Sequence, residues 1–296
     1  MKKKTVFRGI ATALITPFKD GRIDFNAYGR FIDWQIENGV NALVACGTTG
    51  ESSTLADKEH RAAIAYAVQR AAGRVPVIAG TGSNEFDYAV DLSKYAASVC
   101  ADAILVVTPY YNKATQNGLI KMYTSIADAA GVPTILYNVP SRTGVNIEPK
   151  TYAALAEHPN IVAFKEANGN ISKIVETMSY VRGKLDLYSG NDDQIVPLMA
   201  MGGIGAISVL SNILPRETVE ITERFFAGDV AGAAELQCRY HALIDALFSE
   251  VNPIPVKAAV AAMGFTENTL RLPLTEIEEG HKQTLLALMR KEGLAV

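Results

Sequence analysis

Short apolar runs recur along the chain at intervals of roughly 20 to 35 residues. Most of them are continuously apolar rather than alternating, which is typical of strands buried on both faces of a parallel sheet. Several end in Gly or Pro, residues that break a strand and begin a loop. The eight runs are 10–17, 42–47, 75–80, 103–109, 133–140, 161–167, 185–190 and 205–212.

The segments between these runs have helical patterns. One of them places apolar residues at helical spacing, at Tyr28, Phe31, Ile32 and Ile36. Asp24 and Asn26 are candidate caps before this helix, and Gly39 should end it. Strand and helix in eight repeats predict a closed (β/α)8 TIM barrel, an α/β fold. An open doubly wound sheet is the alternative, but the first strand lacks the G-x-G-x-x-G turn of that fold.

The end of the chain has a different pattern. Beyond about Leu214 the sequence is helical in character as far as Val296, which is more than the eighth unit requires. We therefore expect a (β/α)8 catalytic barrel in residues 1–230 and a C-terminal helical layer in residues 231–296.

Composition and charge narrow the class of function. The formal net charge of −3 argues against a surface that binds nucleic acid. The basic start at Met1 is not followed by an apolar stretch of signal-peptide length, and no run is long enough for a membrane helix. We expect a cytoplasmic protein without membrane contact. The three cysteines and four histidines are scattered, so we expect neither a disulfide nor a metal site.

Lys165 ends the sixth apolar run, where a TIM barrel places its chemistry. Period-2 alternation puts Ile161, Ala163 and Lys165 on the inner face, with Val162 and Phe164 on the outer face. An apolar interior disfavours the ammonium form, so a lysine there is suited to Schiff-base chemistry. The alternative is a lysine that extends to solvent from the strand end. Glu166 should face outward in a structural role.

The fifth run supplies two further candidates. Tyr137 has the inward parity, and its phenol could pass protons at the barrel mouth. Arg142 follows in a loop, where a guanidinium can bind a carboxylate through two hydrogen bonds. Simple packing and solvation are the alternatives for these two residues.

The second and fourth runs end in hydroxyl-bearing residues. Thr48 and Thr49 lie between Gly47 and Gly50, so their hydroxyls and amides can form a nest for a small carboxylate. No Gly-Lys-Ser/Thr follows, which excludes a P-loop. After the fourth run, Tyr110 and Tyr111 form a tyrosine pair suited to packing, to an interface or to proton relay.

At these residues the chain resembles the dihydrodipicolinate synthase family of pyruvate-dependent class I aldolases and lyases. The resemblance runs from about residue 9 to residue 264. Its segments are Gly47-Thr48-Thr49-Gly50-Glu51, the stretch 108–113, the stretch 137–144, Phe164-Lys165-Glu166-Ala167 and the stretch 252–257.

The resemblance implies a lyase that condenses pyruvate, held on Lys165 as a Schiff base, with L-aspartate 4-semialdehyde. The product is 4-hydroxy-tetrahydrodipicolinate, on the diaminopimelate route to lysine. The alternative second substrates are those of N-acetylneuraminate lyase and keto-deoxy sugar-acid aldolases. A silent barrel that only binds a small acid is an alternative of another class.

The resemblance also implies roles for individual residues. Thr48, Tyr137 and a neighbouring subunit's Tyr111 would form a proton relay. Thr49 would bind the pyruvate carboxylate, and Arg142 the carboxylate of the semialdehyde. The pyruvate site would also involve Ile207 and Gly190. The family implies a homotetramer, as a dimer of dimers, without metal or organic cofactor.

One departure from the family concerns feedback by lysine. The chain keeps residues that match the lysine site of inhibited relatives, at Ser52, His60, Asn84 and Tyr110. However, it has Asp57 where a histidine is expected and Tyr88 where a glutamate is expected. Because a lysine ammonium taken out of water needs an anionic partner, the sequence predicts weak or absent inhibition.

Overall fold

The computed structural model describes residues 3–296, and within them eight parallel strands close into a barrel. Seven strands lie inside the predicted runs, and β1 begins one residue before its run, so the barrel is confirmed and the open sheet was wrong. The order around the barrel is β1-β10-β9-β8-β7-β6-β5-β4. The strands are β1 (Gly9–Ala13), β4 (Ala42–Ala45), β5 (Val77–Gly80), β6 (Ala103–Val107), β7 (Thr134–Asn138), β8 (Ile161–Glu166), β9 (Asp186–Ser189) and β10 (Gly205–Ser208).

Closure of the barrel depends on a close approach of β1 and β10. Gly9 pairs with Gly205 in parallel register. A Cβ atom on Gly205 would lie 1.8 Å from the carbonyl oxygen of Gly9, and Gly205 has φ +151°. Only glycine fits there, because any side chain would overlap the neighbouring backbone.

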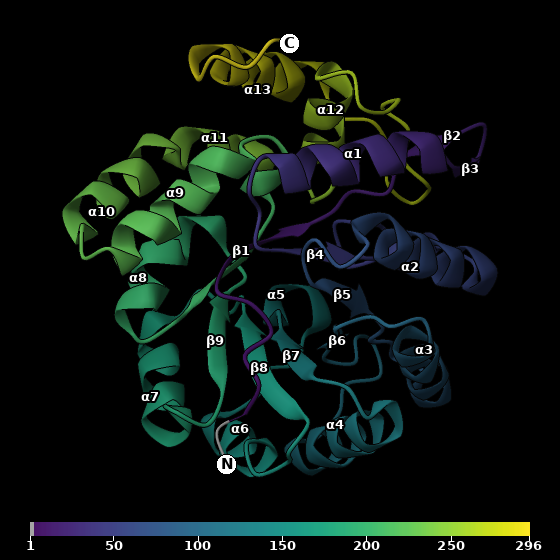
Figure 1. Cartoon of the computed structure of the whole chain (residues 1–296), viewed down its shortest axis with the longest axis vertical. Helices are drawn as coiled ribbons and strands as arrows, with labels where there is room; N and C mark the ends of the chain where they lie inside the picture. The colour runs from purple at the N-terminus through teal and green to yellow at the C-terminus, as the bar shows by residue number, and fades with distance from the viewer. Residues whose placement is uncertain (1–2) are drawn as a thin grey trace.

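Helices alternate with the strands and surround the barrel (Figure 1). In α1 (Phe25–Glu37), the carboxylate of Asp24 accepts from the amide of Ala27 at 2.9 Å, which confirms the predicted cap. The other barrel helices are α2 (Asp57–Ala71), α3 (Phe86–Ser98), α4 (Gln116–Ala130), α5 (Pro140–Thr143), α6 (Pro149–Leu155), α7 (Ile171–Val181), α8 (Ile195–Ala200) and α9 (Pro215–Phe226). A short hairpin, β2 (Phe18–Lys19) with β3 (Arg22–Ile23), precedes α1 and was not predicted.

Four helices follow the eighth unit. They are α10 (Val230–Arg239), α11 (His241–Leu247), α12 (Ile254–Ala262) and α13 (Glu279–Lys291). The expectation of helix as far as Val296 was wrong for residues 264–278 and for residues 292–296, which are not helical. Gly264 leaves the helical region at φ +81°, and Pro273 disfavours a return to it. Figure 1 shows α12 and α13 together beside α1, at the opposite end of the view from the N-terminus.

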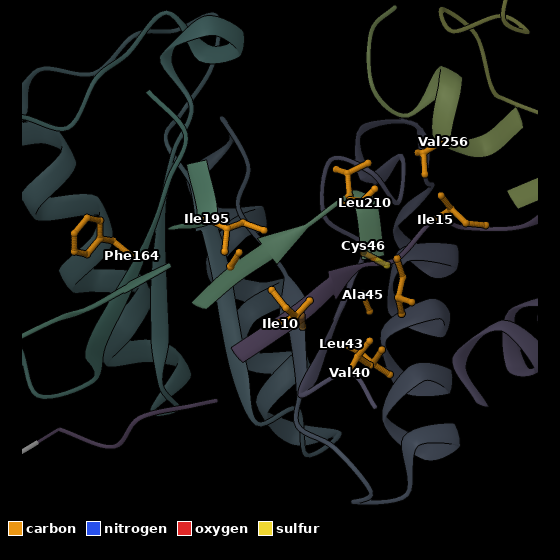
Figure 2. Close-up of a cluster of buried hydrophobic side chains, with 14 of the residues drawn as sticks. Ile10, Ile15, Val40, Leu43, Ala45, Cys46, Phe164, Ile195, Leu210 and Val256 are labelled. Atoms are coloured by element: carbon orange, nitrogen blue, oxygen red, sulfur yellow. The ribbon is translucent and has the colours of Figure 1, made fainter. Parts of the chain in front are cut away.

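The apolar residues form two clusters, one inside the barrel and one between strands and helices. Figure 2 shows part of the outer cluster, where Val256 of α12 reaches the region of Leu210 and Ile15. The C-terminal helices therefore share a core with the barrel. Inside the barrel, Phe7 stacks on Tyr188 with ring centroids 4.2 Å apart.

The register of β8 corrects one prediction from alternation. Thr134 pairs with Ile161 but Ile135 pairs with Ala163, so Val162 is an extra residue in a bulge. Ile161 consequently packs in the outer cluster and Val162 in the inner one, the reverse of the prediction. The bulge lies before Ala163, so the alternation holds from there to Lys165.

Candidate active site

A cavity of about 170 Å³ opens where the loops after the strands meet. Its lining comes from the loops after β4, β7 and β9, from the end of β8, and from the segment before α12. Six of the eight predicted site residues line it, and they are Thr48, Thr49, Tyr137, Arg142, Lys165 and Gly190.

Among the residues that the structure describes, Lys165 is the only lysine that lines this cavity. Its side chain is 6% exposed, and Nζ lies 4.3 Å from the centroid of the Tyr137 ring. Within residues 3–296 the amine has no ion pair and no hydrogen bond. A buried amine without a carboxylate partner is available for chemistry rather than engaged in structure.

Gly190 makes room for the lysine stem. A Cβ atom on Gly190 would lie 3.0 Å from Cε of Lys165 and 2.8 Å from Cβ of Ala167. Any larger residue at this position would push against the side chain that carries the amine.

The loop after β4 forms a tight turn around the two threonines. The amide of Gly50 donates to the carbonyl of Gly47, and the amide of Glu51 to the carbonyl of Thr48, both at 3.0 Å. The amides of Thr48 and Thr49 have no acceptor within the described chain. Two free amides and a threonine hydroxyl at the edge of a cavity form a site for a small anion.

Tyr137 and Arg142 complete the polar lining. Tyr137 pairs with Lys165 across neighbouring strands, so its ring lies beside the amine. Arg142, in α5, donates from Nη2 to the carbonyl of Asn252 at 3.2 Å and is otherwise exposed. Because Arg142 lines the cavity and makes one hydrogen bond, its remaining N–H groups are available to a carboxylate there.

Asn252 was missed as a site residue. It lines the cavity, and its Nδ2 donates to Oγ1 of Thr49 at 3.0 Å. The only signal in the sequence was its place in the segment 252–257, which carried no predicted role.

Ile207 and Tyr111 do not line the cavity. Ile207 is buried in the inner cluster, and Val209, two residues on, reaches the lining instead. Tyr111 is 93% exposed and has φ +70°, and this chain's own cavity leaves it uncovered.

Two buried carboxylates hold the surrounding loops. Glu166 accepts from Nδ2 of Asn138 at 2.8 Å and from the hydroxyl of Tyr152 at 3.0 Å, and burial raises its pKa to about 7. Asp192 accepts from the amides of Val209 and Leu210, and burial raises its pKa as well. Glu166 therefore has the structural position expected of it, whereas Asp192 was not predicted.

In residues 3–296 no group of three or more His, Cys, Asp or Glu side chains is arranged to hold a metal ion, and no helix is long and apolar enough to cross a membrane. The three cysteines are free.

Comparison with known proteins decides the family. The model of the family described as "Dihydrodipicolinate synthetase family" matches residues 6–292. This chain belongs to the dihydrodipicolinate synthetase family.

Individual members of the family are similar over their whole length. A 4-hydroxy-tetrahydrodipicolinate synthase of Alkaliphilus oremlandii is 52% identical, over 98% of this chain and 100% of the relative. The crystal structure of dihydrodipicolinate synthase from Aquifex aeolicus has a TM-score of 0.96 at 44% identity, covering 98% and 99% of the two chains. The chloride-inhibited synthase from Acinetobacter baumannii, complexed with pyruvate, has a TM-score of 0.95 at 42% identity, covering 98% and 100%.

Proposed function

We propose that this chain is a 4-hydroxy-tetrahydrodipicolinate synthase, which condenses pyruvate with L-aspartate 4-semialdehyde. The observation that carries the proposal is the buried, unpaired amine of Lys165 beside a turn with two free amides. The full-length similarity to synthases supports the same activity.

The first half of the reaction binds pyruvate covalently. The keto acid's carboxylate lies in the turn of Thr48 and Thr49, which brings its carbonyl carbon to Nζ of Lys165. The neutral amine adds to this carbon, and loss of water gives an iminium. The phenol of Tyr137, beside the amine, moves the protons that these steps require.

The second half forms the carbon–carbon bond. The iminium accepts electron density when a proton leaves the pyruvate methyl group, which gives an enamine. The enamine carbon attacks the aldehyde carbon, while Arg142 holds the semialdehyde carboxylate at the cavity mouth. The substrate's amino group then attacks the iminium carbon and displaces Lys165, which closes the ring and frees the enzyme. Water from the first step is the only other product.

A second candidate keeps the Schiff base and changes the aldehyde to a polyhydroxylated one, as in N-acetylneuraminate lyase and keto-deoxy sugar-acid aldolases. The position of Arg142 at the mouth favours a partner with a carboxylate near its aldehyde. Borohydride with pyruvate should trap an adduct, and a silent barrel would give none. Turnover with aspartate semialdehyde and not with N-acetylmannosamine supports the synthase, and the reverse result would support the second candidate.

Gly190→Ala should slow formation of the pyruvate adduct by about 100-fold, the usual effect of moving a reacting group by about 1 Å. The added methyl would displace Cε of Lys165. The measurement is the rate of borohydride trapping at saturating pyruvate. Gly280→Ala is the matched control, because a Cβ atom on Gly280 meets nothing within 4 Å. An unchanged trapping rate in Gly190→Ala would show that the stem of Lys165 is not confined.

We further propose a homotetramer in the form of a dimer of dimers, in which Tyr111 enters the cavity of the neighbouring subunit. A tyrosine that is 93% exposed at a positive φ is explained by a partner that covers it. Tyr111→Phe should lower kcat about 100-fold by removing one relay hydroxyl, while the pyruvate adduct still forms. Sedimentation should show a tetramer for both proteins. A monomer with full activity would contradict the shared site.

We also propose a boundary between the barrel and the C-terminal helices. We place the barrel in residues 1–230, of which 1–2 lie outside the described residues, and a C-terminal layer in residues 231–296. In support, β10 and α9 complete the eighth unit, and α11, α12 and α13 pack on one another. Slower hydrogen exchange in this layer than in the barrel strands would contradict the division.

A cytoplasmic location fits the three free cysteines and is testable by cell fractionation.

Lysine should inhibit this enzyme only weakly, with half-inhibition above about 1 mM, which corresponds to roughly −4 kcal/mol of binding. Among the described residues that match the lysine site of inhibited relatives, no carboxylate is free to pair with the ammonium. Asp57 pairs with Arg61 at 2.8 Å, and the hydroxyl of Tyr88 lies 3.4 Å from Nδ1 of His60. Burial raises the pKa of Tyr88 and lowers that of His60, so both are neutral at pH 7.

A steady-state titration with both substrates measures this inhibition. Tyr88→Glu should strengthen inhibition by lysine, since it places a carboxylate where the ammonium requires one. Half-inhibition of the natural chain below about 1 mM would mean that another group binds the ammonium.

A further inference from the structure

A buried ion pair joins the threonine turn to the C-terminal layer. Oε1 of Glu51 lies 2.8 Å from Nζ of Lys257, and both side chains are 0% exposed. Glu51 directly follows the turn, and Lys257 belongs to α12. Burying two charges costs desolvation energy, so such a pair is no better for stability than well-packed apolar residues. Because stability does not explain the pair, we look to the positions of the two segments that it joins.

Both members of the pair are held in place by further contacts. Nζ of Lys257 also donates to the carbonyls of Thr16 at 2.6 Å and Thr269 at 3.2 Å, so the ammonium has two hydrogen bonds besides the ion pair. Oε2 of Glu51 accepts from the amide of Arg271 at 3.1 Å. These contacts connect Glu51 and Lys257 to the loop after β1 and to the segment between α12 and α13.

The three residues that end the turn are each held by a residue from another segment of the chain. Thr49 accepts from Asn252, and the carbonyl of Gly50 accepts from the hydroxyl of Thr16 at 2.7 Å. Glu51 is held by Lys257, although its backbone lies in the left-handed region at φ +55°. A residue other than glycine is seldom stable there without such contacts. Contacts with other segments thus hold the part of the turn that contains the free amide of Thr49 and directly follows that of Thr48.

We propose that the Glu51–Lys257 pair is a positioning device, which holds the threonine turn in the shape that binds the keto acid's carboxylate. The inference rests on the proposed function, and it makes the C-terminal layer a part of the active site. Glu51 and Lys257 do not line the cavity and therefore act through the turn.

The test separates positioning from stability. Glu51→Gln and the double variant Glu51→Gln/Lys257→Met both remove the pair, but only the double variant leaves no unpaired charge buried. The double variant should therefore have a higher melting temperature than Glu51→Gln. Both should raise the KM for pyruvate about tenfold and leave the KM for the semialdehyde within twofold. The proposal would be overturned if the double variant regained both the melting temperature and the pyruvate KM of the natural chain. Equal changes in the KM for pyruvate and the KM for the semialdehyde would also overturn it.

Thr16→Val is a second test of whether contacts from other segments position the threonine turn. It keeps the side-chain shape and removes only the hydroxyl that donates to the carbonyl of Gly50. It should raise the pyruvate KM severalfold with the semialdehyde KM unchanged, and an unaltered pyruvate KM would overturn the proposal. Glu157→Gln is the matched control, because Glu157 forms an exposed pair with Lys184 at 2.7 Å.

Borohydride trapping of pyruvate on the natural chain is measured in the same series. Its absence would refute the proposed function, whereas trapping with unaltered variants would refute only this inference.

Discussion

Lys165→Ala should abolish the borohydride-trapped pyruvate adduct and lower turnover by on the order of 10⁵-fold, the advantage typical of a well-oriented intramolecular nucleophile. Nζ of Lys165 is buried, has no partner in the described chain and lies next to Tyr137. No other lysine in residues 3–296 lines the cavity, so none of these can take over the Schiff base. The measurement combines the mass of the intact protein after trapping with steady-state turnover.

Two other lysines provide the controls for this result. Lys173 is exposed and pairs with Glu176 at 3.0 Å, and Lys113 lies outside the cavity lining. Lys173→Ala and Lys113→Ala should trap the same single pyruvyl unit as the natural chain. Peptide mapping should place that unit on Lys165. A label on Lys113 or Lys173 would mean that the covalent chemistry has been assigned to the wrong residue.

The barrel was predictable because its strands are buried on both faces. Continuous apolar runs of strand length are typical of strands in a buried parallel sheet. Their recurrence with helices between them predicts the closed fold. The inner or outer position of single residues was less predictable. One bulged residue, Val162, exchanged the faces of Ile161 and Val162, and nothing in a local alternation pattern marks such a bulge.

The candidate site was predictable where it lies at the ends of strands. Lys165 and Tyr137 follow from inward parity and from the rule that barrel chemistry lies at the carboxyl ends. Asn252 and Lys257 do not follow from it, because their contacts with Thr49 and Glu51 join segments about 200 residues apart. Such contacts depend on how the C-terminal helices pack on the barrel, which sequence periodicity does not encode.

Arg142→Ala should raise the KM for aspartate semialdehyde about 30-fold, or ~2 kcal/mol, and leave the KM for pyruvate within about threefold. The expected cost is at the low end for truncation of a hydrogen-bonded charge pair, because the guanidinium is exposed and anchored by one contact, to the carbonyl of Asn252. Steady-state kinetics with each substrate varied in turn gives both values.

Arg142→Lys is the informative companion, since it keeps the charge but cannot form two parallel hydrogen bonds with a carboxylate. It should recover only part of the lost affinity for the semialdehyde. Pyruvate trapping should proceed normally in both variants, because the carboxylate of pyruvate lies in the threonine turn. If both KM values rise together in Arg142→Ala, then Arg142 supports the loop around Asn252 and does not bind the second substrate.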